Sequence, residues 1–97
     1  MLAALVDLDV HVPAAQSLKD KRGVVKHAIA DLRRELNVSV AEVDHHDLWQ
    51  RAALGVAVAA SSEAGARKVA QQVEQRLARD PRLEIVAVAV EVVGSEQ

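Results

Sequence analysis

The chain has 97 residues, of which 51% are hydrophobic and 27% are charged, and its formal net charge at pH 7 is -2. This composition is typical of one globular domain, here residues 1–97, and excludes a chain that is disordered throughout. The net negative charge excludes a uniformly basic nucleic-acid binder, and the single aromatic residue excludes binding of bases on rows of aromatic rings.

The absence of cysteine removes disulfides, thiolate nucleophiles and cysteine-based zinc sites from consideration. Asp7 and Asp9 interrupt the apolar N-terminal run, which argues against a signal peptide. No segment approaches the roughly 20 apolar residues that cross a membrane. We therefore expect a cytoplasmic protein with no membrane contact. Arginine outnumbers lysine and asparagine occurs once, a bias that favours a GC-rich or thermophilic source.

In chain order, residues 2–11 alternate between apolar and polar or small side chains, which predicts a strand that ends before Pro13. Ser17, followed by Asp20 three positions later, predicts a helix N-cap. Helical spacing of apolar residues predicts a helix from about 18 to 36, with Asn37 as its left-handed terminator. The stripe of this helix consists of Leu18, Val25, Ile29, Leu32 and Leu36.

In the second half of the chain, segments with the two-residue hydrophobic period of strands again flank a segment with the period of a helix. This pattern predicts a strand over 38–43, a loop, a strand over 52–60, a helix over 63–79 capped by the preceding serines, and a strand over 83–93. Asp80 and Pro81 end the helix, and the tail from Gly94 is expected to fray. The order βαββαβ predicts a ferredoxin-like α+β fold, with two helices on one face of a four-stranded antiparallel sheet and the first and last strands innermost.

The sheet face that the helices leave uncovered should be small and apolar, whereas a solvated antiparallel face is normally polar. We interpret it as the interface of a homo-oligomer, a dimer or higher, or as a docking face for a macromolecule. The alternative is a solvated face that is rich in alanine through compositional bias. Besides Asp7 and Gly55, its predicted members are Ala3, Leu5, Ala53, Ala57, Ala59, Ile85, Ala87 and Ala89.

The loop between the second and third predicted strands holds two of the four histidines and the only tryptophan. Loops on a rigid sheet often carry binding residues. We predict a partner-binding loop, with an internally hydrogen-bonded loop as the alternative. Trp49 is either an interface anchor beside Arg51 or a ring folded over the sheet edge. The predicted loop residues are Asp44, His45, His46, Asp47, Trp49, Gln50 and Arg51.

Imidazole and carboxylate groups make this loop the place where a divalent metal or a general base would lie. The candidates are Asp44, His45, His46 and Asp47. Neighbouring strand residues point to opposite sides, no HExxH motif is present, and no serine or threonine in the loop completes a triad. We therefore predict no catalytic residue, metal or cofactor, and favour a non-enzymatic protein. A small metal-dependent or hydrolytic enzyme centred on this loop is the alternative.

The first predicted helix carries cations at helical intervals, away from its apolar stripe. Phosphate or RNA contact is one interpretation, since a helix N-terminus adds to the attraction of an anion. A solvated helix face, diluted by Asp20, Asp31 and Glu35, is the other. No small-molecule ligand is predicted. The candidate cations are Lys19, Lys21, Arg22, Lys26 and Arg33.

Two runs of residues resemble the signatures of the YlxP-like family of small bacterial proteins of unknown function. The first is Ser17 to Arg22 followed by Val24-Val25-Lys26, and the second is Asn37 to Arg51. The resemblance covers nearly the whole chain and implies a ferredoxin-like fold, but no catalytic residues. Family members are often encoded beside translation-initiation and ribosome-maturation factors, which implies a role near the ribosome. A purely structural, oligomer-forming protein remains a third hypothesis.

Overall fold

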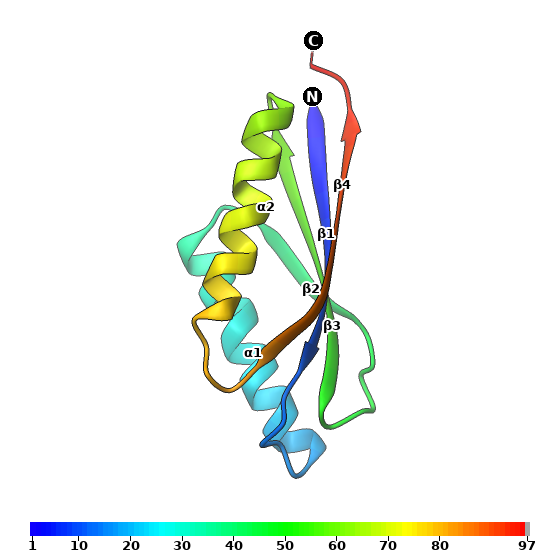
Figure 1. Cartoon of the computed structure of the whole chain (residues 1–97), viewed down its shortest axis with the longest axis vertical. Helices are drawn as coiled ribbons and strands as arrows, with labels where there is room; N and C mark the ends of the chain where they lie inside the picture. Colours follow the sequence, from blue (N-terminus) through cyan, green and yellow to red (C-terminus); the bar gives the residue numbers. More distant parts are fainter. Residues whose placement is uncertain (97) are drawn as a thin grey trace.

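The computed structural model describes residues 1–96 and has two helices on one face of a four-stranded sheet (Figure 1). The predicted βαββαβ order and ferredoxin-like fold are confirmed. The elements are β1 (Leu2–His11), α1 (Leu18–Glu35), β2 (Ser39–Asp44), β3 (Arg51–Ala60), α2 (Glu63–Ala78) and β4 (Glu84–Gly94).

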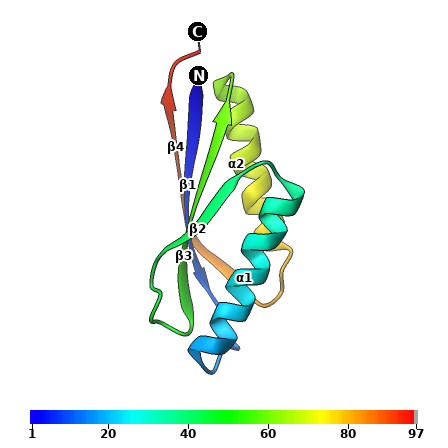
Figure 2. The same cartoon turned by 180° about the vertical axis from the view of Figure 1, so that it is seen from behind.

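The strand order in the sheet is β2-β3-β1-β4, and all neighbours are antiparallel. The expectation that the first and last strands lie innermost is wrong, because β3 and β1 occupy the centre and β4 forms an edge. Each helical crossover skips one strand, so that β3 lies between β1 and β2, and β1 lies between β3 and β4. Figure 2 shows both helices on the same side of this sheet.

Both helices begin at the predicted serine caps. The Ser17 hydroxyl accepts a hydrogen bond from the Asp20 amide, and the Ser62 hydroxyl accepts one from the Gly65 amide. The predicted left-handed terminator at Asn37 is wrong, since His45 is the one non-glycine residue of the described chain with positive φ. Helix α1 ends instead at Leu36 in an extended conformation, and the chain runs directly into β2.

The core lies between the sheet and the helices and is filled by alternate side chains of β1 and β3 and the inner stripes of α1 and α2. On β4 the alternation of side chains between the two faces of the sheet is interrupted once, which the sequence did not predict. The pairing with β1 steps from Asp9–Ala87 to Val10–Ile85, which leaves Val86 as the extra residue of a bulge. Ile85 therefore packs against the core and does not belong to the open face, and Val86 is 56% exposed.

The two chain ends meet at one end of the sheet. The Met1 amino group lies 3.0 Å from the Ser95 carbonyl oxygen, and Gly94 belongs to β4 with φ of 99°. A Cβ at Gly94 would lie 2.3 Å from the Met1 carbonyl oxygen, so this position requires glycine. Gly94 thus belongs to β4 and not to a frayed tail, the fraying of residues 95–96 stays a prediction, and Gln97 lies outside the described residues.

No helix within residues 1–96 combines the length and the apolar character needed to cross a membrane.

Candidate functional site

Lys21 links the first turn of α1 to the end of β2, although the sequence places it among the cations available to a phosphate. Its side chain is completely buried, and its ammonium lies 2.8 Å from the Glu42 carboxylate. It also donates to the carbonyl oxygens of His45 at 3.0 Å and His46 at 3.3 Å. All three donors of the ammonium are therefore occupied, as a buried charge requires. Lys21 holds the loop and cannot contact RNA.

The sequence contained a signal for this burial. Lys21 follows Leu18 by three positions and precedes Val25 by four, which places it on the apolar stripe of α1. Glu42 points to the same side of the sheet as its partner on β3, Leu54, which is buried in the core. Lys21 and Glu42 thus occupy core-facing positions, which are otherwise apolar, on a helix and a strand that face each other. Such a pattern of opposite charges indicates a buried ion pair.

The loop from Asp44 to Arg51 is anchored at both ends. The Gln50 side-chain amide donates to the carbonyl oxygens of Pro13 and Ala15, and the Val12 amide donates to the Gln50 carbonyl. His45 has φ of 61°, so the chain turns sharply at the point that Lys21 holds.

The apolar tip of this loop is not folded onto the core. Leu48 is 47% exposed and Trp49 is 51% exposed. In Figure 1 the loop between β2 and β3 extends from the sheet on the side opposite the helices. Trp49 is therefore not buried in the core, and its role as an interface anchor stays a prediction.

The two loop histidines have different surroundings. The His46 ring contacts the Glu42 carbonyl oxygen at 3.0 Å, whereas His45 borders a hollow on the open face together with Asp7 and Asp9. Across residues 1–96 no group of three or more histidine, aspartate or glutamate side chains is placed to hold a metal ion. Asp44, His45, His46 and Asp47 thus do not form a ligand set in this structure.

The open face combines small apolar residues with acidic side chains. Alanines of β1, β3 and β4 form much of its surface, and the exposed apolar side chains of Leu5 and Val93 stand among them. Val43, the extra residue of a second bulge, lies over Gly55, where a Cβ would come within 2.9 Å of its side chain. Asp7 is exposed near the middle of the face, and Asp9 is paired with Arg51.

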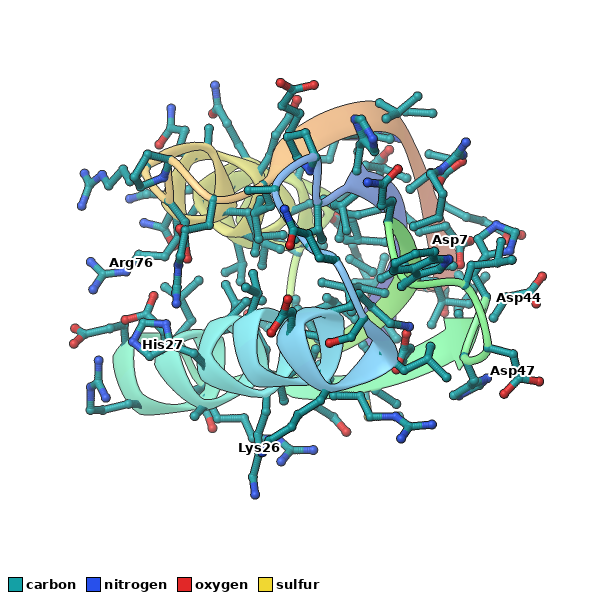
Figure 3. All side chains as sticks on the ribbon, turned by 90° about the horizontal axis from the view of Figure 1, so that it is seen from below. Asp7, Lys26, His27, Asp44, Asp47 and Arg76 are labelled. Atoms are coloured by element: carbon teal, nitrogen blue, oxygen red, sulfur yellow. The ribbon has the colours of Figure 1, made fainter. Side chains whose placement is uncertain are left out.

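Three cations of α1 form a basic stripe, a name used here for Lys19, Arg22 and Lys26. All three are exposed and make no ion pair with any residue from 1 to 96. Figure 3 shows Lys26 pointing away from the sheet. Arg33 lies further along the same side, and its guanidinium donates to the Val40 carbonyl oxygen at 2.7 Å. Four of the five predicted cations remain at the surface, and Lys21 does not.

A cleft between α1 and the turn that follows α2 was not predicted from the sequence. It brings His27 of α1 beside Arg76 of α2, with Asp80 and Arg82 of the following turn. The sequence shows Asp80 only as part of a helix stop, and its neighbours in the cleft are distant along the chain. No local pattern indicates such a site, because crossing helices bring its residues together.

Two arginine–aspartate pairs border this cleft, and Arg34 and Glu35 extend the first of them. Hydrogen bonds from Arg76 lower the pKa of the Asp31 carboxyl below its ordinary value, and hydrogen bonds from Arg82 do the same to the pKa of Asp80. The same contacts raise the pKa values of both arginines. All four groups are therefore charged at neutral pH.

The fold resembles two designed proteins of known structure. One is a designed protein with a ferredoxin fold, solved by solution NMR, with a TM-score of 0.60 and 23% identity over 93% of this chain and 85% of that chain. The other, the designed protein Foldit4, has a TM-score of 0.55 and 14% identity over 96% of this chain and 98% of that chain. At these identities the likeness concerns the fold alone.

Sequence comparison gives a closer relation. The family model described as "Protein of unknown function (DUF503)" matches residues 3–90. The uncharacterized protein YlxP of Bacillus subtilis (strain 168) is 36% identical over 70 residues, which are 72% of this chain and 76% of that protein. The chain therefore belongs to the DUF503, or YlxP-like, family of bacterial proteins of unknown function.

Proposed function

We propose that this chain is a non-enzymatic accessory protein of translation or ribosome maturation that binds RNA phosphate through the basic stripe of α1. The observation that carries the proposal is the set of three exposed cations without ion-pair partners in the described chain. They lie three and four residues apart, so they share one side of the helix. Such a row follows a phosphate backbone without reading base sequence.

The carboxylates of α1, which could neutralise this row, are engaged elsewhere. The Asp20 carboxylate accepts from the Gln16 amide at 3.1 Å. Asp31 pairs with Arg76 of α2 at 2.8 Å, and Glu35 pairs with Arg34. Asp31 and Glu35 are therefore compensated by arginines, and Asp20 alone keeps an uncompensated negative charge, next to Lys19 in the first turn of α1.

Gly23 supports a close approach to this side of the helix. It lies between Arg22 and Lys26 on the exposed side, and a Cβ there would meet nothing within 4 Å. Packing within the described protein does not explain a glycine that costs about 1 kcal/mol of helix stability relative to alanine. A surface without a side chain at this point lets a backbone phosphate lie against the helix.

The separation of charge explains how a chain of net charge -2 can bind a polyanion. Figure 3 shows Lys26 on the helix side and Asp7, Asp44 and Asp47 on another side of the molecule. Local charge decides contact with a phosphate, because solvent screens charges beyond about 10 Å at 0.1 M salt. The acidic side would orient the protein with its helices toward RNA.

The loop tip at Leu48 and Trp49 provides a second contact, with RNA or with a protein. Its half-exposed side chains are large and apolar, and Trp is among the residue types most enriched at binding hot spots. Lys21 fixes this loop to α1, so the position of the loop tip relative to the basic stripe is fixed.

Homo-oligomerisation through the open face is the second part of the proposal. Leu5, at 39% exposure, and Val93, also at 39%, lie on this face among alanines, and the small side chains permit a second sheet to approach closely. An assembly with the open faces together would present the basic stripes of its copies outward, since the helices lie on the opposite side of each sheet (Figure 2).

The RNA proposal is tested by binding of labelled single-stranded and duplex RNA at increasing salt. Replacing Lys19, Arg22 and Lys26 by alanine should weaken binding evenly across sequences and reduce the log–log salt slope by about three. The matched control replaces Arg34, Arg67 and Lys68, which are exposed cations away from the stripe. If both variants lose the same RNA affinity, the loss is due to net charge and not to the basic stripe. If the variant without Lys19, Arg22 and Lys26 still binds RNA, α1 is not part of the binding site.

The cellular part is tested by co-sedimentation of the protein with ribosomal particles in a lysate at low and moderate salt. Salt-sensitive migration with one subunit or its precursor, lost in the stripe variant and kept in the control, is the expected result. Absence from every ribosomal fraction would contradict the translation role.

A further inference from the structure

The cleft between α1 and the α2–β4 turn has a volume of about 490 Å³, within the range of small-molecule sites. It lies outside the basic stripe, none of whose residues borders it. Figure 3 shows His27 of α1 and Arg76 of α2 on the same side of the molecule, opposite Asp44 and Asp47. The charged and titratable residues at its border are His27, Asp31, Arg76, Arg79, Asp80 and Arg82.

Two of the three arginines are held in position by carboxylates. Arg76 donates from Nε and Nη2 to Asp31 at 2.8 and 3.1 Å. Arg82 donates from Nε and Nη2 to the two oxygens of Asp80 at 3.0 and 2.7 Å. These are two-point contacts that fix the plane of each guanidinium. In both, Nη1 makes no hydrogen bond with residues 1–96 and remains able to donate.

Arg79 differs from the other two arginines. Its side chain is exposed and has no ion-pair partner among residues 1–96. With the residues that these ion pairs include, four guanidinium groups stand against three carboxylates and leave one positive charge at the cleft. The arginines are Arg34, Arg76, Arg79 and Arg82, and the carboxylates are Asp31, Glu35 and Asp80. That charge is available to an anion.

His27 adds a further donor. Arg82 Nη2 lies 2.9 Å from His27 Nδ1, and a guanidinium can only donate, so Nδ1 must be the acceptor. The other ring nitrogen, Nε2, then carries a proton. This N–H makes no hydrogen bond within the described chain, and the side chain is 62% exposed.

The remaining border of the cleft is apolar: Pro81 is exposed there, and Ala28 and Leu77 form its floor at 4% and 2% exposure. A free oxyanion would not use this surface, whereas an organic group attached to the oxyanion would cover it. Several guanidinium N–H donors suit a phosphate, which offers three terminal oxygens, better than a carboxylate, which offers two.

We propose that this cleft binds a small molecule that carries a phosphate monoester, with the phosphate on Arg79 and the free Nη1 groups of Arg76 and Arg82, and the organic part on the exposed ring of Pro81. The assignment is independent of RNA binding, because it uses no residue of the basic stripe. If one of the two binding proposals fails, the other can therefore still be tested.

The test is an NMR titration of the full chain with uridine 5′-monophosphate, and separately with inorganic phosphate and acetate. The amide and side-chain signals of Arg79, Arg82 and His27 should shift in a saturable way with the monophosphate below about 10 mM. Inorganic phosphate should shift the same signals with weaker affinity. An acetate response equal to that of the monophosphate would overturn the assignment of a phosphate, and no saturable shift with any probe would overturn the site.

Variants separate the cleft from general charge. Arg79→Ala should weaken the monophosphate about tenfold, since one charge-assisted contact is lost. Lys68→Ala removes an exposed cation of α2 outside the cleft and should leave the affinity unchanged. Arg82→Lys keeps the positive charge but removes the planar guanidinium with its several N–H donors, so it should also weaken binding of the monophosphate. Equal effects of Arg79→Ala and Lys68→Ala would show non-specific attraction and contradict the proposal.

Discussion

The ammonium of Lys21 lies 2.8 Å from the carboxylate of Glu42, and the lysine side chain is completely buried while the glutamate side chain is 15% exposed. This pair joins α1 to β2 and, through the carbonyl oxygens of His45 and His46, to the start of the loop. The loop is therefore positioned by a charge inside the protein and presents its own side chains outward.

Lys21→Ala should destabilise the protein by about 3 kcal/mol, because it leaves the Glu42 carboxylate and two carbonyl oxygens without their partner. Urea unfolding of the two proteins measures the difference. Lys19→Ala, two residues away on the exposed side, should change the free energy of unfolding by less than about 0.5 kcal/mol. Similar effects of both changes would contradict the buried role of Lys21.

Gly23→Ala and Gly94→Ala should have opposite effects on stability. Alanine at Gly23 meets no atom within 4 Å and should stabilise α1 by about 0.5–1 kcal/mol. Alanine at Gly94 must adopt φ of 99° against the Met1 carbonyl, and should destabilise by at least about 1 kcal/mol. Chemical denaturation compares them, and a stabilised Gly94→Ala would be incompatible with this terminal contact.

Gly23→Ala also tests the RNA model. A stabilised variant that binds RNA more weakly would support close approach of a phosphate at this point. Unchanged RNA affinity would mean that the nucleic acid does not lie over Gly23.

Acid should destabilise the protein in part through Asp31 and Asp80. Their arginine partners lower the pKa of both carboxyls from the ordinary value of 3.8. The contribution to stability is therefore complete above the unfolded pKa and is lost as the pH falls through the lower folded pKa. Thermal unfolding between neutral pH and about pH 3 should show this loss.

Variants test the source of the acid effect. Asp31→Asn and Asp80→Asn should be less stable than the parent at neutral pH and should lose less on acidification. The Asp47 carboxylate is exposed and has no ion-pair partner within residues 1–96. The stability of Asp47→Asn should therefore vary with pH in the same way as that of the parent protein. If the Asp31 and Asp80 variants also vary in that way, these ion pairs do not govern the acid response.

The open-face assembly should respond to a charge at its centre. Leu5→Lys should lower the mass measured by light scattering, since it places a solvated ammonium, beside Ala57 and Glu91, where a second sheet would pack. Trp49→Ala should leave that mass unchanged, because the loop tip lies away from the middle of the face. Dissociation by Trp49→Ala in a folded protein, with Leu5→Lys unaffected, would locate the interface in the loop.

Much of the fold followed from local patterns in the sequence. The alternation in residues 2–11 and 51–60 and the helical spacing in α1 and α2 predicted the elements within one or two residues. Ser17 and the pair Ser61–Ser62 were predicted as caps because capping is a contact between residues two or three positions apart, and the structure uses Ser17 and Ser62. These features depend on neighbours along the chain, so the sequence by itself determined them.

Tertiary structure decided the rest. A bulge at Val86 moved Ile85 from the open face to the core, and nothing in an alternating run of valine and alanine marks where the alternation breaks. Lys21 became buried because Glu42 of β2 and two carbonyl oxygens of the following loop, both distant along the chain, accept its hydrogen bonds. Arg76 and Arg82 meet at one cleft because α2 and its turn pack beside α1. The sequence alone determined the periodicity of each element, and the packing between elements determined which charges are buried, paired or free.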